Sequence, residues 1–169
     1  MSKAVLISIR PKWCEKIVSG EKSIEVRKTK PKLEIPFKCY IYQTGQGGVI
    51  GEFVCDDIFE RIVRVGTSRQ TTKYCLCDWN MDCTPLDGVL SDACLTLDEL
   101  EKYLDGGVGY GWHISNLKIY DTPKELSKFS RPFENCIDKV CDEFGCASCE
   151  NGGHIKRPPQ SWGYVEEFL

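Results

Sequence analysis

The apolar segments of this chain are short, and their length restricts the fold more than any other feature. No apolar run approaches the length of a membrane span. Most runs are rich in β-branched and aromatic residues and end at glycine or proline, a pattern typical of short strands joined by turns. We therefore predict six strands, at residues 4–9, 23–28, 37–43, 49–58, 111–120 and 161–166.

Two segments have helical signals instead. Pro11 suits a first helical position and Gly20 a C-terminal stop, so residues 11–19 are predicted to form a short helix. Thr96 and Glu99 have the spacing of a capping box before a second helix. Strands and helices with short links predict an α+β fold, a small mixed β-barrel with packing helices, as one domain over residues 1–169. The expected core includes Ile7, Ile17, Ile24, Val26, Ile41, Phe53, Leu100 and Ile114.

Two excursions interrupt this pattern, at residues 64–94 and 130–157, and both are rich in cysteine. Long excursions in compact domains are usually functional or held by something other than a core. The apolar phase of the 111–120 strand also changes at Ser115 and Asn116, which predicts a bulge or sharp bend there.

Charge is distributed unevenly along the chain. Residues 1–40 hold ten basic and four acidic residues, a net charge of +6, whereas residues 41–169 carry a net charge of −9. A basic region on an acidic body predicts a localised anionic partner, although the lysines of residues 28–38 can equally form a solvated loop.

The N-terminal residues lack the apolar core of a secretory signal, so we expect a cytoplasmic protein that does not enter membranes. The chain has 11 cysteines, an odd number. Since the cytosol keeps thiols reduced, metal ligation or buried thiols are expected rather than a full disulfide set.

One segment has a more specific pattern. Ser8-Ile9-Arg10-Pro11 precedes the first helix, and Gly20-Glu21-Lys22-Ser23-Ile24-Glu25-Val26-Arg27 follows it. This arrangement resembles the G-x-K-x-x-E-x-R signature of the ASCH domain family, and the segments 51–54 and 110–115 are similar to that family as well. The resemblance implies a PUA-like barrel with a ligand cleft, and a domain that binds RNA or a modified nucleoside or nucleotide.

The signature residues can form such a cleft. Glu25 and Arg27 share a strand face, and Lys22 can join them only from the turn after Gly20. Arg27 can bind phosphate, and Lys22 and Glu25 can donate to and accept from a base or ribose. Trp13 can stack on a base at the rim or pack against Ile17. The alternative for the three charged residues is a surface salt bridge.

The same resemblance also allows an enzyme. Some small ASCH proteins are amidohydrolases that deacylate N4-acetylcytidine-type nucleosides. In that case Lys22 would act as base or nucleophile activator, with Glu25 standing where those enzymes have threonine. Their catalytic glutamate falls close to Ala93, with Asp92 beside it. His113 is a further candidate, although a lone strand histidine is usually structural.

The cysteines of the second excursion predict a structural zinc site. Cys146 and Cys149 have the C-x₂-C spacing of a zinc half-site, and Cys136 and Cys141 are the expected partners, with His154 as a possible alternate ligand. Few large apolar residues lie there, so metal would supply folding energy. A reduced loop is the alternative.

The first excursion contains a second cysteine group, whose members Cys75, Cys77, Cys83 and Cys94 are candidates for another metal site. If the cysteine segments carry the function, the protein is a zinc-stabilised interaction adaptor. Cys14, Cys39 and Cys55 occupy apolar positions and are predicted to be small buried hydrophobes.

Overall fold

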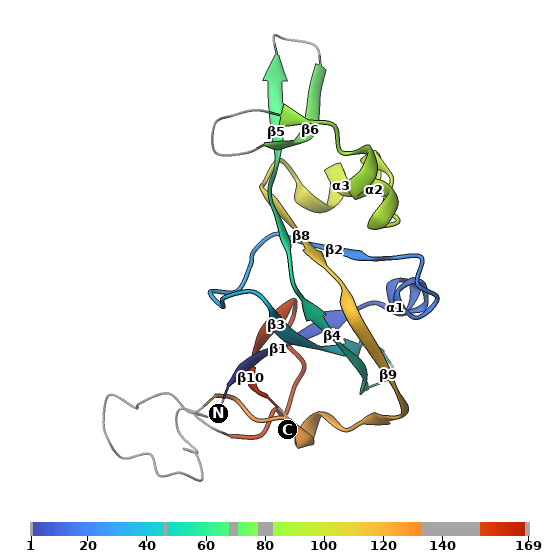
Figure 1. Ribbon diagram of the computed structural model, residues 1–169, viewed down its shortest axis with the longest axis vertical. Helices are drawn as coiled ribbons and strands as arrows, with labels where there is room; N and C mark the ends of the chain where they lie inside the picture. The colour runs from blue at the N-terminus through green and yellow to red at the C-terminus, as the bar shows by residue number, and fades with distance from the viewer. Residues whose placement is uncertain (1, 46, 68–70, 78–82, 133–152, 168–169) are drawn as a thin grey trace, which may run out of the picture. The chain divides into compact units, whose positions relative to one another are not determined.

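The computed structural model describes residues 2–45, 47–67, 71–77, 83–132 and 153–167 (Figure 1). Their contacts divide the chain into two compact units. The first unit takes in residues 1–14, 37–54 and 116–169, and the second takes in residues 15–36 and 55–115. Each unit contains a five-stranded sheet, and short helices complete the chain, so the mixed α+β class predicted from the sequence is confirmed.

The sheet of the first unit has the strand order β10-β1-β3-β4-β9. Its strands are β1 (Lys3–Ile9), β3 (Phe37–Gln43), β4 (Gly48–Cys55), β9 (Ser115–Lys124) and β10 (Trp162–Glu166). β1 pairs antiparallel with β10 and parallel with β3, so it lies inside the sheet and is buried along almost its whole length. A 3₁₀ helix, η2 (Leu126–Lys128), follows β9. The hydrophobic cluster of this unit is built from Ala4, Leu6, Tyr40, Tyr42, Val49, Phe129, Ile155 and Val165.

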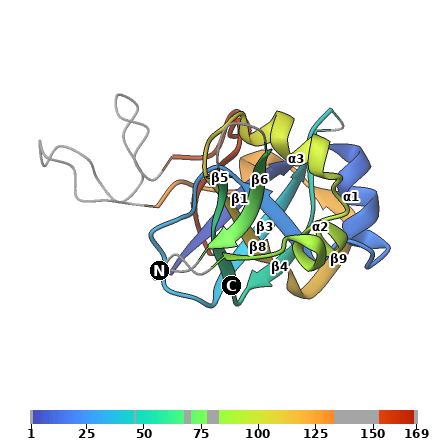
Figure 2. The same ribbon diagram turned by 90° about the horizontal axis from the view of Figure 1, so that it is seen from above.

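The sheet of the second unit has the strand order β2-β8-β5-β6-β7. Its strands are β2 (Ile24–Arg27), β5 (Ile58–Thr67), β6 (Thr71–Cys77), β7 (Cys83–Thr84) and β8 (Gly109–His113). β5 pairs antiparallel with both β6 and β8, and β5 and β6 lie side by side in both ribbon views (Figures 1 and 2). The pairing of β2 with β8 joins two strands that are far apart in the sequence.

Three short α-helices complete the fold: α1 (Pro11–Val18), α2 (Asp87–Asp92) and α3 (Leu97–Leu104). The capping box of α3 is present as predicted, with the Thr96 hydroxyl accepting from the Glu99 backbone N–H. α3 ends where Asp105 adopts a left-handed conformation. The core cluster of the second unit is formed by Ile24, Val26, Ile62, Tyr74, Leu86, Val89, Ala93, Leu100 and Leu104.

All eight residues expected in the core are buried. The bend predicted at Ser115 and Asn116 is also confirmed, because Asn116 has a φ of 48° and separates β8 from most of β9. Two predicted strands were wrong in their extent. Residues 49–58 are not continuous, since β4 ends at Cys55 and β5 begins at Ile58, and residues 111–120 are divided between β8 and β9. Among the described residues, no helix is both long and apolar enough to cross a membrane.

Candidate ligand-binding site

The turn after α1 places the first charged residue of the site. Gly20 has a φ of 80°, a conformation that favours glycine, and its N–H donates to the Ile17 carbonyl. The Lys22 N–H then donates to the Lys16 carbonyl at 2.9 Å, so the chain folds back on the end of the helix. Lys22 thus lies in the turn before β2, as the sequence predicted.

β2 separates apolar from charged side chains. Ile24 and Val26 belong to the core cluster of the second unit, and Glu25 and Arg27 alternate with them. The Glu25 carboxylate binds both cations: Oε2 lies 3.3 Å from Lys22 Nζ, and Oε1 lies 2.9 Å from Arg27 Nη2. The three signature side chains therefore meet, with Glu25 in the middle.

Lys22 is held by three oxygen atoms of its own unit. Its Nζ donates to the carbonyls of Ile24 and Ala93, each at 2.7 Å, and lies near Glu25. A lysine ammonium has three protons to donate, so these three oxygens match its capacity. Burial lowers the pKa of Lys22, while the negative charge of Glu25 partly opposes that shift.

The cluster is more deeply buried than a cleft lining requires. Lys22, Glu25 and Arg27 have relative exposures of 3%, 6% and 8%. A surface salt bridge, the alternative considered for these residues, does not fit this burial. Removing Arg27 should therefore cost stability, because breaking a buried ion pair leaves a charge without compensation.

An exposed surface of lysines and tyrosines begins directly after the cluster. Lys28 and Lys30 follow Arg27, and both are exposed. Lys28 Nζ lies 5.5 Å from the ring centre of Tyr103 on α3, and Lys30 Nζ lies 5.9 Å from that of Tyr110 on β8. We call these four residues the lysine–tyrosine face.

Two contacts connect this face to the buried cluster. Tyr110 is the register partner of Arg27 in the β2–β8 pair. The Tyr103 hydroxyl is hydrogen-bonded by the Lys28 backbone and lies within the electrostatic range of Arg27 and Glu25. Burial raises the pKa of Tyr103, and the positive charge of Arg27 opposes this shift. These two lysine–tyrosine pairs were not identified from the sequence, although the basic residues 28–38 and the 110–115 segment were the available signals.

The loop that continues from this face forms part of a pocket. The pocket has a volume of about 460 Å³ and combines charged and apolar side chains. Its lining residues are Lys30, Pro31, Leu33, Glu34, Ile35 and Ile58. Lys30 therefore belongs to both the lysine–tyrosine face and the pocket.

Comparison with known proteins places this arrangement in a family. The model of the ASCH domain matches residues 7–115, which include the whole signature and the strands around it. The chain belongs to the ASCH domain family. Its mixed α+β fold is of the PUA-like class.

Solved structures agree with the family assignment at the level of the fold. The ASCH protein of Zymomonas mobilis matches with a TM-score of 0.58 and 17% identity, covering 97% of this chain and 88% of that one. A tyrosine-to-phenylalanine variant of the same protein matches with the same TM-score and identity, covering 98% and 92%. No curated protein matches the chain.

Two further side chains named from the sequence lie elsewhere in this ASCH domain. Trp13 is half-buried on α1 in the first unit, and Lys12 Nζ lies 4.4 Å from its ring centre. Its position at the rim of a binding site stays a prediction. His113 Nδ1 lies 2.7 Å from Asp56 Oδ1, and this hydrogen bond lowers the pKa of Asp56. That partner is consistent with a structural role for His113.

The zinc site predicted at Cys136, Cys141, Cys146 and Cys149 lies outside the described residues, so it stays a prediction. His154, the possible alternate ligand, is exposed, and its Nδ1 lies 3.2 Å from Ser130 Oγ.

The four cysteines of the first excursion do not all lie together in the structure. Cys75, Cys77 and Cys83 come together on β6 and β7, whereas Cys94 donates to the Glu21 carbonyl at 3.3 Å. Cys77 and Cys83 form a disulfide, which differs from the expectation of reduced thiols throughout. The two residues are register partners in the β6–β7 pair, and this brings their sulfur atoms into contact.

The remaining cysteines in the described part of the chain are confirmed as small buried residues. Cys14, Cys39 and Cys55 are 2% exposed or less. Burial raises the pKa of Cys55 to about 12, so this thiol stays protonated near neutral pH.

Proposed function

We propose that this ASCH domain binds single-stranded RNA or a nucleotide on the lysine–tyrosine face, beside the buried Lys22–Glu25–Arg27 cluster. The observation that carries the proposal is the pairing of two exposed lysines with two tyrosine rings at the end of the family signature. Lysines neutralise phosphates, and aromatic rings stack on bases without strong sequence preference.

The buried cluster strengthens the case for an anionic ligand. Two cations and one carboxylate leave a net charge of +1 in the cluster, and burial reduces the screening of that charge by salt. Glu25 holds Arg27 close to the strand that carries Tyr110. We assign Lys22 and Glu25 to fixing this arrangement and Arg27 to attracting phosphate. Trp13, whose ring lies beside Lys12 in the first unit, stays a predicted stacking residue.

The contacts of Lys22 favour binding over the amidohydrolase alternative. A general base must be neutral before it accepts a proton, and a neutral amine has only two N–H groups. Lys22 Nζ lies among three oxygen atoms, one of them the Ala93 carbonyl at the position where the related enzymes have glutamate. These three oxygen atoms favour the ammonium form and oppose the effect of burial, which lowers the pKa of Lys22. Incubation with N4-acetylcytidine should therefore release no cytidine, and release that Lys22→Met abolishes would restore the enzyme hypothesis.

The binding proposal is tested by titrating a fluorescent single-stranded RNA with the full chain. The variant Lys28→Ala with Lys30→Ala should bind at least about tenfold more weakly, because hydrogen bonds to charged groups are worth about 1.5–3 kcal/mol. The matched control is Lys118→Ala with Lys156→Ala, which removes two exposed lysines of the first unit. Equal loss in both variants would mean that only total charge matters and would refute a defined site.

A second pair of variants separates stacking from charge. Tyr103→Phe keeps the ring and should retain most of the RNA affinity. Tyr103→Ala removes the ring and should weaken binding by about 1–3 kcal/mol, the usual contribution of one stacked base. Melting curves should be recorded for both, since Tyr103 is 39% exposed and its loss should cost little stability. If both variants bind like the wild type, Tyr103 is not part of the site.

A further inference from the structure

Three cysteines lie together on the side of β6 that faces away from the core. Side chains alternate along a strand, and Tyr74 and Leu76 pack in the core cluster of the second unit. Cys75 and Cys77 therefore share the opposite face. Cys83 on β7 is the register partner of Cys77, so it adds its sulfur to the same face.

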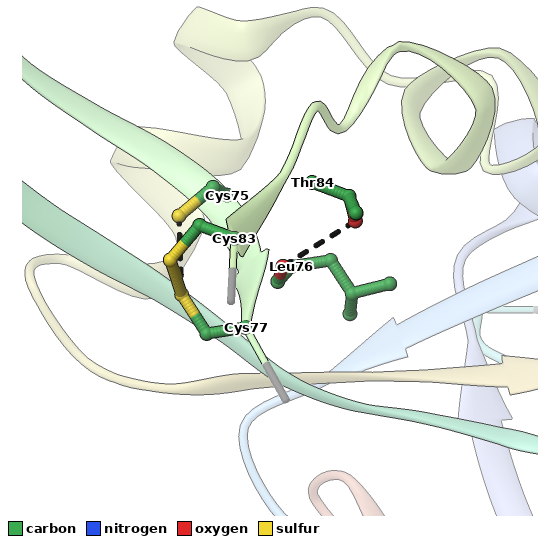
Figure 3. The surroundings of a disulfide bond; sticks show 5 residues. All are labelled: Cys75, Leu76, Cys77, Cys83 and Thr84. Atoms are coloured by element: carbon green, nitrogen blue, oxygen red, sulfur yellow. Dashed lines mark hydrogen bonds between the residues drawn. A yellow bond between two sulfur atoms is a disulfide. The ribbon is translucent and has the colours of Figure 1, made fainter. Parts of the chain in front are cut away.

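The sulfur atoms are close enough to bind one ion. Cys75 Sγ lies 3.2 Å from Cys77 Sγ, and all three sulfur atoms lie within 4.8 Å of one another. Figure 3 shows the three sulfur atoms next to one another, on side chains from β6 and β7. Zinc–sulfur bonds of about 2.3 Å in a tetrahedral site place sulfurs about 3.8 Å apart, so small side-chain movements suffice.

The two usual roles of cysteine, packing in a core and forming a structural disulfide, do not explain this group of three. Thiols that fill apolar space, such as Cys39, are fully buried; Cys77 is also buried, but Cys75 is half-buried and Cys83 is exposed, so core packing does not explain the group. A structural disulfide uses Cys77 and Cys83, but it does not account for a third sulfur in contact with it.

We propose that Cys75, Cys77 and Cys83 form a zinc site in the reduced protein, with three thiolate ligands and a water molecule in the fourth position. The Cys77–Cys83 disulfide is the oxidised state of the same site. Its reduction takes two electrons and two protons from two molecules of a small thiol, which leave as their disulfide. Zinc binding then releases one proton from each of the three thiols to solvent. This site shares no residue with the zinc site predicted at Cys136, Cys141, Cys146 and Cys149.

The site has a structural consequence for the second unit. β7 has only two residues, and among the strands that the structure describes it pairs with β6 alone. Either the disulfide or the metal links Cys83 to β6 and holds β7 in place. The redox state of the surroundings decides which link forms, and zinc competes directly with oxidation.

The test measures zinc binding by the full chain after reduction with a phosphine. A chromogenic zinc chelator gives the number of bound equivalents, and cobalt substitution reports thiolate ligation through its sulfur-to-metal charge-transfer band. The wild type should bind one more equivalent of zinc than the triple variant that carries Cys75→Ser, Cys77→Ser and Cys83→Ser. Cys94→Ser is the matched control, because it removes a half-buried thiol of the same unit outside the trio. It should bind as much zinc as the wild type.

A single substitution keeps the test decisive if the triple variant fails to fold. Cys83 is exposed, so Cys83→Ser should fold normally and should bind zinc at this site at least about tenfold more weakly, given that even outer-shell changes cost about 10–100-fold. Reoxidising the wild type should release the same equivalent. Equal stoichiometry and affinity in the wild type and the Cys83→Ser protein, or a cobalt band unchanged by the triple substitution, would overturn the proposal.

Discussion

Glu25 determines whether the other two signature residues can be buried. It is the carboxylate between Lys22 and Arg27, and its side chain is 8% exposed. Burying two cations side by side is costly unless a counter-charge and hydrogen bonds compensate. Glu25 supplies the counter-charge for both, so it contributes more to stability than either cation alone.

Replacing Glu25 by glutamine should therefore destabilise the fold by about 3 kcal/mol or more, because two buried cations lose their shared counter-charge. Urea unfolding followed by circular dichroism measures this change. Glu21→Gln is the matched control: Glu21 pairs with Lys16, but its side chain is 61% exposed. The control should change the free energy of unfolding by no more than about 0.5 kcal/mol. Equal stability of the two variants would show that the buried pairs contribute nothing.

The sequence predicted which residues meet, but not how deeply they lie. The alternation in β2 and the glycine at position 20 were enough to bring Lys22, Glu25 and Arg27 together. Their burial depends on the Ala93 carbonyl, 71 residues further along the chain from Lys22. No local pattern indicates that a distant backbone oxygen will solvate an ammonium group, so the burial was missed.

At the scale of elements, local signals predicted α1 and α3 but missed α2, which lies in the first excursion. α3 could be predicted because the residues of its N-terminal cap lie within four consecutive positions, Thr96 to Glu99. The cap is reciprocal: Glu99 N donates to Thr96 Oγ1 at 3.2 Å, and Thr96 N donates to Glu99 Oε2 at 3.0 Å. It positions a helix that carries Leu100 and Leu104 into the core and Tyr103 onto the lysine–tyrosine face.

Thr96→Ala should lower the free energy of unfolding by about 1 kcal/mol, the usual cost of losing an N-cap side chain. Thr96 is exposed, so the loss reflects the cap and not packing. Thr96→Ser keeps the hydroxyl and should retain most of the stability. Chemical unfolding of the three proteins checks this order, and a serine variant as unstable as the alanine variant would contradict it.

The strands of the first excursion could not be predicted in the same way. β5 and β6 cover residues that lack hydrophobic periodicity, and β5 is irregular between Phe59 and Ile62, where its register with β8 shifts. Arg61 there has a φ of 61°. Pairing with distant strands stabilises these segments, and a bulge interrupts the alternation that would have revealed them.

At the scale of the whole molecule, the charge distribution limits how RNA can bind. The net charge of −3 comes from a basic N-terminal region and an acidic remainder. An acidic body repels phosphates, so general attraction to nucleic acid should be weak and contacts should concentrate on a few lysines. The lysine–tyrosine face holds two of these lysines next to a buried cluster of net charge +1.

This distribution makes the salt dependence of RNA binding a direct count of the phosphate contacts. For single strands, the slope of log K against log salt concentration is about −0.7 for each neutralised phosphate. If Lys28 and Lys30 each contact one phosphate, replacing both by alanine should make the slope about 1.4 shallower. The measurement is a series of titrations with the same RNA at increasing salt. Lys118→Ala with Lys156→Ala should leave the slope unchanged, because these exposed lysines are not part of the lysine–tyrosine face. An unchanged slope in the Lys28 and Lys30 variant would contradict phosphate binding by this face, whatever its affinity. Equally reduced slopes in both variants would show that the RNA is bound diffusely.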